Sequence, residues 1–100
     1  MEKYPKYAGK LMGWARSDNL WMRRAAAVTL IIPAKKGEFL KEALEISDIL
    51  IGDKEDLVQK GYGWLLKEES RARQNEIFLY VMKNRRIMPR TALRLSLIHI

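Results

Sequence analysis

The apolar residues of this chain recur with the spacing of an α-helix, and this period limits the possible folds more than any other feature. In residues 5–16, Tyr7, Leu11 and Trp14 fall on one stripe. Residues 38–51 carry a wider apolar stripe with acidic side chains on the opposite face. Since no segment alternates apolar and polar residues for long enough to require a strand, the sequence predicts an all-α fold.

Capping and breaking residues divide the chain into roughly five to six helices. Ser17-Asp18-Asn19 is typical of a helix N-cap, and the segment from Pro33 to Gly37 is expected to end the helix that follows. The connections are short, so neighbouring helices should pack as antiparallel hairpins. The predicted helices cover residues 5–16, 20–32, 38–51, 55–69 and 73–84, and a last one opens at residues 88–94. The helix over 73–84 is expected to bury Ile77, Phe78, Val81 and Met82.

Two segments of the chain resemble each other at an offset of 36 residues. Residues 21–28 and residues 57–64 both run from apolar through polar or basic to small residues. A period of this length is close to that of solenoids built from stacked helical hairpins. Gly61 and Gly63 each cost about 1 kcal/mol relative to alanine inside a helix. We therefore expect close packing, or the close approach of a ligand, at both glycines.

The net charge of +7 is unevenly distributed along the sequence. Residues 1–34 and 60–94 are basic, with net charges of +4 and +6, whereas residues 35–59 carry −3. Basic surfaces contributed by two separate segments indicate a polyanionic partner. A generally basic protein without such a partner remains the alternative.

The 36-residue offset aligns Arg24 with Lys60. Equivalent positions of stacked repeats lie on one side of a solenoid, so these two cations should form a ladder that Arg90 extends. Such a ladder suits a phosphate backbone. In the alternative, Arg24 and Lys60 pair with the acidic residues of the segment 38–56.

Trp64 follows Lys60 by one helical turn and comes directly after Gly63. This position gives the indole room to lie against a flat group, such as a base or a cationic ring. Packing in the core is the alternative for Trp64. It is also the interpretation that we give to Trp14 and Trp21.

The sequence offers no hydrolytic centre of its own. There is no cysteine, no glycine-rich phosphate loop and no pair of carboxylates with a reason to converge. Asp18 and Asp53 occupy positions typical of helix N-caps. We predict no catalytic residue, no metal site and no cofactor in this chain.

The last six residues, 95–100, read as the translation of an adapter used for sequencing libraries. We expect them to lie outside a domain of residues 1–94 and to contribute little to its stability. His99, the only histidine, would then have no role, and the natural chain would continue beyond Arg94. A genuine apolar C-terminus that docks on the domain is the alternative.

Three segments in order, residues 17–26, 53–68 and 88–94, resemble the C-terminal part of AlkD-like DNA alkylation repair proteins. These are DNA glycosylases built from HEAT-like helical repeats, so the resemblance implies a HEAT-like α-solenoid. The departures are Gly61 in place of the usual alanine, Tyr62 in place of a small aliphatic residue and Leu95 in place of tyrosine.

The resemblance implies excision of positively charged N3- or N7-alkylated purines from duplex DNA. Arg24 would correspond to an arginine near the DNA backbone, and Trp64 to a tryptophan that cradles the lesion. The family's catalytic aspartate belongs to a motif expected upstream of Met1, and neither Asp18 nor Asp48 matches it. This chain would then be inactive alone. The alternative is a non-catalytic module that binds damaged or branched DNA, or a protein.

The sequence contains neither a signal peptide nor an apolar run long enough to span a membrane. We therefore expect a cytoplasmic protein with no membrane partner. The resemblance to DNA alkylation repair proteins further implies a nucleoid-associated monomer.

Overall fold

The computed structural model describes the backbone of residues 4–98 and the side chains of residues 9–98. All of the regular secondary structure in this range is helical and no strand occurs in it, so the predicted all-α class is confirmed. The helices are α1 (Tyr4–Ala15), α2 (Leu20–Val28), α3 (Ile31–Ala34), α4 (Leu40–Leu50), α5 (Asp56–Glu69), α6 (Gln74–Asn84) and α7 (Arg90–Ser96). The side chain of Tyr7, part of the first predicted stripe, and His99 lie outside the described residues.

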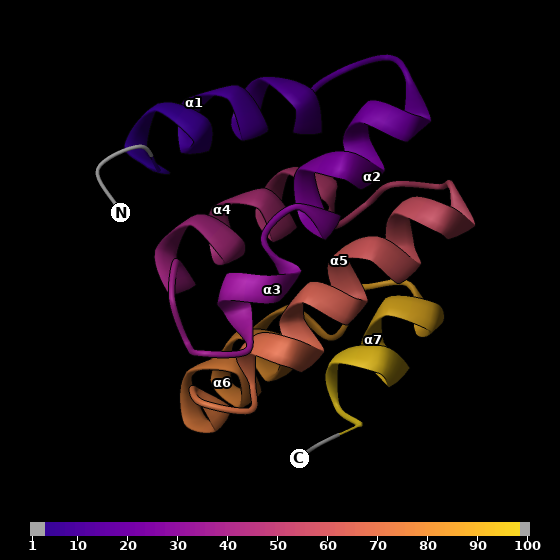
Figure 1. Ribbon diagram of the computed structural model, residues 1–100. Helices are drawn as coiled ribbons and strands as arrows, with labels where there is room; N and C mark the ends of the chain where they lie inside the picture. The colour runs from indigo at the N-terminus through magenta and orange to yellow at the C-terminus, as the bar shows by residue number, and fades with distance from the viewer. Residues whose placement is uncertain (1–3, 99–100) are drawn as a thin grey trace.

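The helices form two layers (Figure 1). In this view α1, α4 and α6 lie on one side, and α2, α5 and α7 lie on the other. Within the second layer α5 packs against both α2 and α7, and it also contacts α3, α4 and α6. The smallest dimension of the Cα trace is 18 Å, which suits two helices about 10 Å thick. The arrangement is compatible with a helical solenoid.

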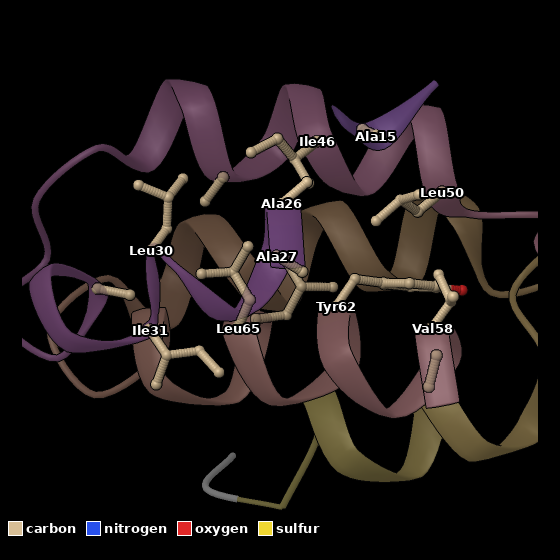
Figure 2. Packing of buried hydrophobic residues seen from close by; sticks show 14 of the residues in the cluster. Ala15, Ala26, Ala27, Leu30, Ile31, Ile46, Leu50, Val58, Tyr62 and Leu65 are labelled. Atoms are coloured by element: carbon tan, nitrogen blue, oxygen red, sulfur yellow. The ribbon is translucent and has the colours of Figure 1, made fainter. Parts of the chain in front are cut away.

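Small and branched apolar residues join the two layers. Ala26 and Ala27 of α2 lie between Ile46 of α4 and Leu65 of α5 (Figure 2). These four residues have no exposed surface. The alanines let the helices approach closely, and the larger side chains fill the space between the layers.

The second predicted helix ends earlier than expected. It stops at Val28, and Pro33 lies inside the separate short helix α3 instead of ending α2. Proline is tolerated there because the first turn of a helix has no intrahelical partner for its missing N–H. The start at Leu20 is as predicted, since the Asn19 side chain accepts a hydrogen bond of 2.8 Å from the Trp21 backbone N–H.

Two further expectations were wrong. Phe78 is 41% exposed on α6, whereas Ile77 and Val81 of that helix are buried. Neither Asp18 nor Asp53 is an N-cap, because Asn19 is the cap of α2 and Glu55 precedes α5. Asp53 instead accepts a hydrogen bond from the Glu55 N–H. The other oxygen of Asp53 pairs at 2.6 Å with Arg23 of α2, so this aspartate holds a loop against a helix.

Residues 95–97 are packed into the fold, unlike the tail expected from the sequence. α7 continues to Ser96, whose hydroxyl is buried and donates to the Ala92 carbonyl at 2.9 Å. Leu97 is partly buried against the core, and Ile98 is exposed. This packing does not test the origin of the segment, which stays a prediction.

Candidate nucleic-acid interface

The helices of the second layer bring basic side chains from distant parts of the sequence to one place. α2, α5 and α7 lie side by side in Figure 1, with α5 between the other two. A pocket of about 490 Å³ opens along them. Its lining residues are Arg24, Lys60, Trp64, Lys67, Thr91, Arg94 and Leu95.

Two glycines of α5 face the flanking helices, and one of them explains how close α7 comes to α5. A Cβ atom built on Gly63 would lie 3.1 Å from the Ala92 Cα of α7. A Cβ atom built on Gly61 faces the other way and would lie 3.5 Å from the Arg24 Cγ of α2. Close packing is therefore the reason for Gly63, because α7 rests on the backbone there. At Gly61 the contact is an ordinary van der Waals distance.

Arg24 is held in place by the adjacent helix. Its Nη1 donates a hydrogen bond of 2.6 Å to the Leu57 carbonyl oxygen in the first turn of α5. A guanidinium group has five N–H donors, so this contact leaves others for a second acceptor. Arg24 is therefore positioned before any ligand binds. It makes no ion pair with the acidic residues 38–56 within the described part of the chain.

Lys60 has the acidic partner that the alternative interpretation expected. Its Nζ lies 2.9 Å from Asp56 Oδ2, and the two side chains are 53% and 60% exposed. Exposed ion pairs of this kind contribute about 0–1 kcal/mol. A phosphate group can therefore replace the carboxylate at little cost.

Trp64 lines the pocket and is 41% exposed, so it is not a core residue. Its Nε1 donates a hydrogen bond of 3.0 Å to Glu68 Oε2. The other two tryptophans differ from one another. Trp14 is packed against the core as predicted, whereas Trp21 is 61% exposed, and the core interpretation of Trp21 was wrong.

The structure brings Arg24, Lys60 and Trp64 together, but Arg90 does not line the pocket. Arg90 is the first residue of α7, and Arg94, one turn later, is the arginine that reaches the pocket. Arg94 follows Lys60 by 34 residues, an offset close to the one that links Lys60 to Arg24. That spacing was a signal that could have identified it.

Sequence reasoning also missed Lys67, Thr91 and Leu95. Lys67 follows Lys60 by two helical turns and therefore lies on the same face of α5. Thr91 and Leu95 had no comparable signal, because their place depends on how α7 rests on α5.

None of the residues that line this pocket has a carboxylate side chain. Asp48, the acidic residue of α4 considered above, accepts a hydrogen bond of 2.7 Å from the Tyr80 hydroxyl of α6. Both helices belong to the opposite layer. Over the described residues, no group of three or more acidic, histidine or cysteine side chains is arranged to hold a metal ion. The pocket therefore offers positive charge and one aromatic face.

A model of the family described as DNA alkylation repair enzyme matches residues 1–100. The chain belongs to this family. Searches of curated proteins and of solved structures found no match. Membership of the DNA alkylation repair enzyme family implies a role in DNA repair and contact with DNA. The basic side chains that line the pocket agree with contact with DNA. None of the described helices is both long and apolar enough to cross a membrane.

Proposed function

We propose that this protein is AlkD-like: a HEAT-like repeat protein that binds duplex DNA and takes part in the excision of positively charged N3- or N7-alkylated purines. The supporting observation is the convergence of four cations and one exposed tryptophan on a single pocket, from helices that are far apart in the sequence. Such a protein would work as a monomer in the cytoplasm, beside the nucleoid.

The basic side chains are proposed to hold the phosphate backbone. The four basic side chains that line the pocket are Arg24, Lys60, Lys67 and Arg94. Each phosphate contact releases a counterion, so such binding weakens as salt rises. These contacts are independent of sequence and serve to position the duplex.

Trp64 is proposed to contact the alkylated base. Alkylation at N3 or N7 gives a purine a positive charge, and the face of an indole attracts a cation. The attraction is worth about 0.5–2 kcal/mol, depending on how much water is excluded. Because an unmodified purine is neutral, the same ring discriminates against it.

A non-catalytic binding module is the second candidate, and the composition of the pocket supports it. Cleavage of a glycosidic bond passes through a positively charged sugar, which a carboxylate stabilises. The pocket lining provides none. We therefore expect the 100-residue chain to bind a damaged duplex without releasing its base. Release of 7-methylguanine that depends on one Asp or Glu of this chain would contradict this expectation.

Two substitutions test the binding function, because they should change the affinity for DNA in different ways. Arg24→Ala should weaken binding to damaged and undamaged duplexes equally, and it should lower the salt dependence by about one charge. Trp64→Ala should remove the preference for a duplex with a cationic purine and leave the affinity for undamaged DNA almost unchanged. Affinities measured by fluorescence anisotropy at several salt concentrations separate the two effects.

Arg86→Ala is the matched control, because Arg86 is exposed and is not among the residues that line the pocket. It removes the same charge and should lower the salt dependence less than Arg24→Ala does. Equal effects of the two arginine substitutions would mean that DNA binds by overall charge alone. Absence of duplex binding by the wild-type chain at low salt would overturn the proposal.

A further inference from the structure

Glu68 is outside the pocket lining but contacts Trp64, which belongs to it. It follows Trp64 by one turn of α5, and only 4% of its surface is exposed. Its Oε2 accepts the hydrogen bond of 3.0 Å from the indole N–H, and its Oε1 accepts one from Arg71 Nε. Both oxygens of the carboxylate are therefore engaged, and one of them holds the polar edge of the tryptophan.

The Glu68 carboxylate is ionised in the folded protein. Burial by itself would raise the pKa of this group, but hydrogen bonds from Arg71 and Trp64, together with the positive charges of Arg71 and Lys35, lower the pKa below its ordinary value. A negative charge therefore lies at the edge of the indole ring at neutral pH. Hydrogen bonds to a charged acceptor are about twice as strong as neutral ones, so this contact restrains the ring effectively.

The cations around Trp64 are the reason why the negative charge of Glu68 matters for the binding of a positively charged base. The pocket lining contains four cations, and these repel a positively charged base. Trp64 is the one aromatic residue among them. An anionic acceptor on the indole N–H increases the electron density of the ring, and its charge opposes the field of the surrounding cations. Both effects favour a cation on the face of the ring.

We propose that Glu68 is a positioning residue that fixes the orientation of Trp64 and makes its exposed face selective for a positively charged purine. This inference rests on the proposed function, because it concerns the base that Trp64 contacts. Glu68 itself does not line the pocket. It acts through the tryptophan, and its other oxygen is held by Arg71, whose side chain is half exposed.

Glu68→Gln is the appropriate variant, because it keeps the size and an acceptor oxygen while it removes the charge. We would measure the affinity of the full chain for two duplexes that differ at one base. The first contains N7-methylguanine on a 2′-fluoro sugar, which stabilises the glycosidic bond. The second contains 7-methyl-7-deazaguanine, which has the same shape and no charge. The ratio of the two dissociation constants reports selectivity for the cation.

We expect the wild-type chain to prefer the cationic duplex by about three- to thirtyfold. In Glu68→Gln this preference should fall by at least about threefold, whereas affinity for the neutral duplex should change by less than about twofold. Glu69→Gln is the matched control, since it is the same substitution at the next residue. Glu69 is fully buried and lies outside the pocket lining, so its substitution should leave the ratio unchanged.

A second measurement tests the contact itself. The Nε1–H resonance of Trp64 in a ¹H–¹⁵N spectrum should move upfield in Glu68→Gln, because a neutral acceptor forms a weaker hydrogen bond. It should stay in place in Glu69→Gln.

The outcomes separate this inference from the function on which it rests. No preference of the wild-type chain for the cationic duplex would overturn both. A wild-type preference that Glu68→Gln retains in full would overturn the role of Glu68 alone. The same conclusion would follow if the affinities for both duplexes fell equally, since that is the result of a purely structural role.

Discussion

Gly61 and Gly63 offer a paired test of how closely the helices around the pocket are packed. Both are buried, and both lie in the interior of α5. A methyl group added at Gly63 would meet the Ala92 Cα and the Leu95 Cβ at 3.1 Å and the Ala92 carbonyl oxygen at 3.2 Å. At Gly61 the shortest such distance is 3.5 Å. At Gly63 a methyl group would be crowded, and its neighbours on α7 would have to shift by a few tenths of an ångström, whereas Gly61 accepts one.

The magnitudes follow from these distances. Replacing glycine by alanine inside a helix stabilises it by about 0.5–1 kcal/mol, because the unfolded chain loses freedom. Gly61→Ala should gain this amount. Gly63→Ala gains the same amount but must displace the backbone of α7, and such overpacking typically costs about 1–3 kcal/mol. The difference between the two variants therefore isolates the cost at Gly63.

Thermal unfolding followed by circular dichroism measures this difference directly. For a domain of this size, 1 kcal/mol corresponds to about 4–8 °C, so Gly63→Ala should melt roughly 5–20 °C below Gly61→Ala. Denaturant unfolding provides the free energies independently. Equal stability of the two variants would show that α7 does not rest on α5 at Gly63. The position of α7 beside the pocket would then be different.

Three other predictions concern stability. Glu69 is buried, and burial raises its pKa from 4.5 to about 8, with Arg73 opposing the shift and the nearby Glu38 and Glu42 adding to it. As pH rises from about 4.5 to 8, the free energy of unfolding of the wild type should therefore fall relative to that of Glu69→Gln, by about 1.4 kcal/mol per pH unit. Urea unfolding at several pH values measures this, and the same pH dependence in both proteins would contradict it. Arg23→Ala should lower the free energy of unfolding by about 1–3 kcal/mol in the same assay, because the mostly buried Asp53 carboxylate loses its charged partner. A decrease below about 0.5 kcal/mol would count against a stabilising role of that ion pair. Removal of residues 95–100 should lower the thermal midpoint by several degrees, since part of this segment packs against the core, and an unchanged midpoint would favour the original expectation of a dispensable tail.

Local patterns in the sequence were sufficient to predict where the helices lie. Apolar spacing predicted every long helix to within a few residues, because each one must bury a stripe of its own surface. The Asn19 cap fixed the start of α2 through a contact with its own neighbour, Trp21. The end of α2 was harder to predict. The chain turns at Thr29 and Leu30, and Pro33 is then accommodated in a new helix.

The 36-residue repeat was sufficient to place Arg24 and Lys60 on one surface, because equivalent residues of stacked helices face the same way. It did not determine where α7 lies along α5. That position depends on the space that Gly63 leaves for Ala92, and it decides that Arg94 rather than Arg90 reaches the pocket.

The exposure of side chains was decided by the tertiary structure alone. The sequence gives Trp14, Trp21 and Trp64 similar helical positions, yet Trp14 packs against the core while the other two are exposed. Whether an aromatic ring meets solvent or a second layer of helices depends on what packs against its own helix. The contact between Glu68 and Trp64 lies within one turn of α5, but the burial that makes it important comes from the surrounding helices. Burial removes competing water, and only the assembled fold can do that.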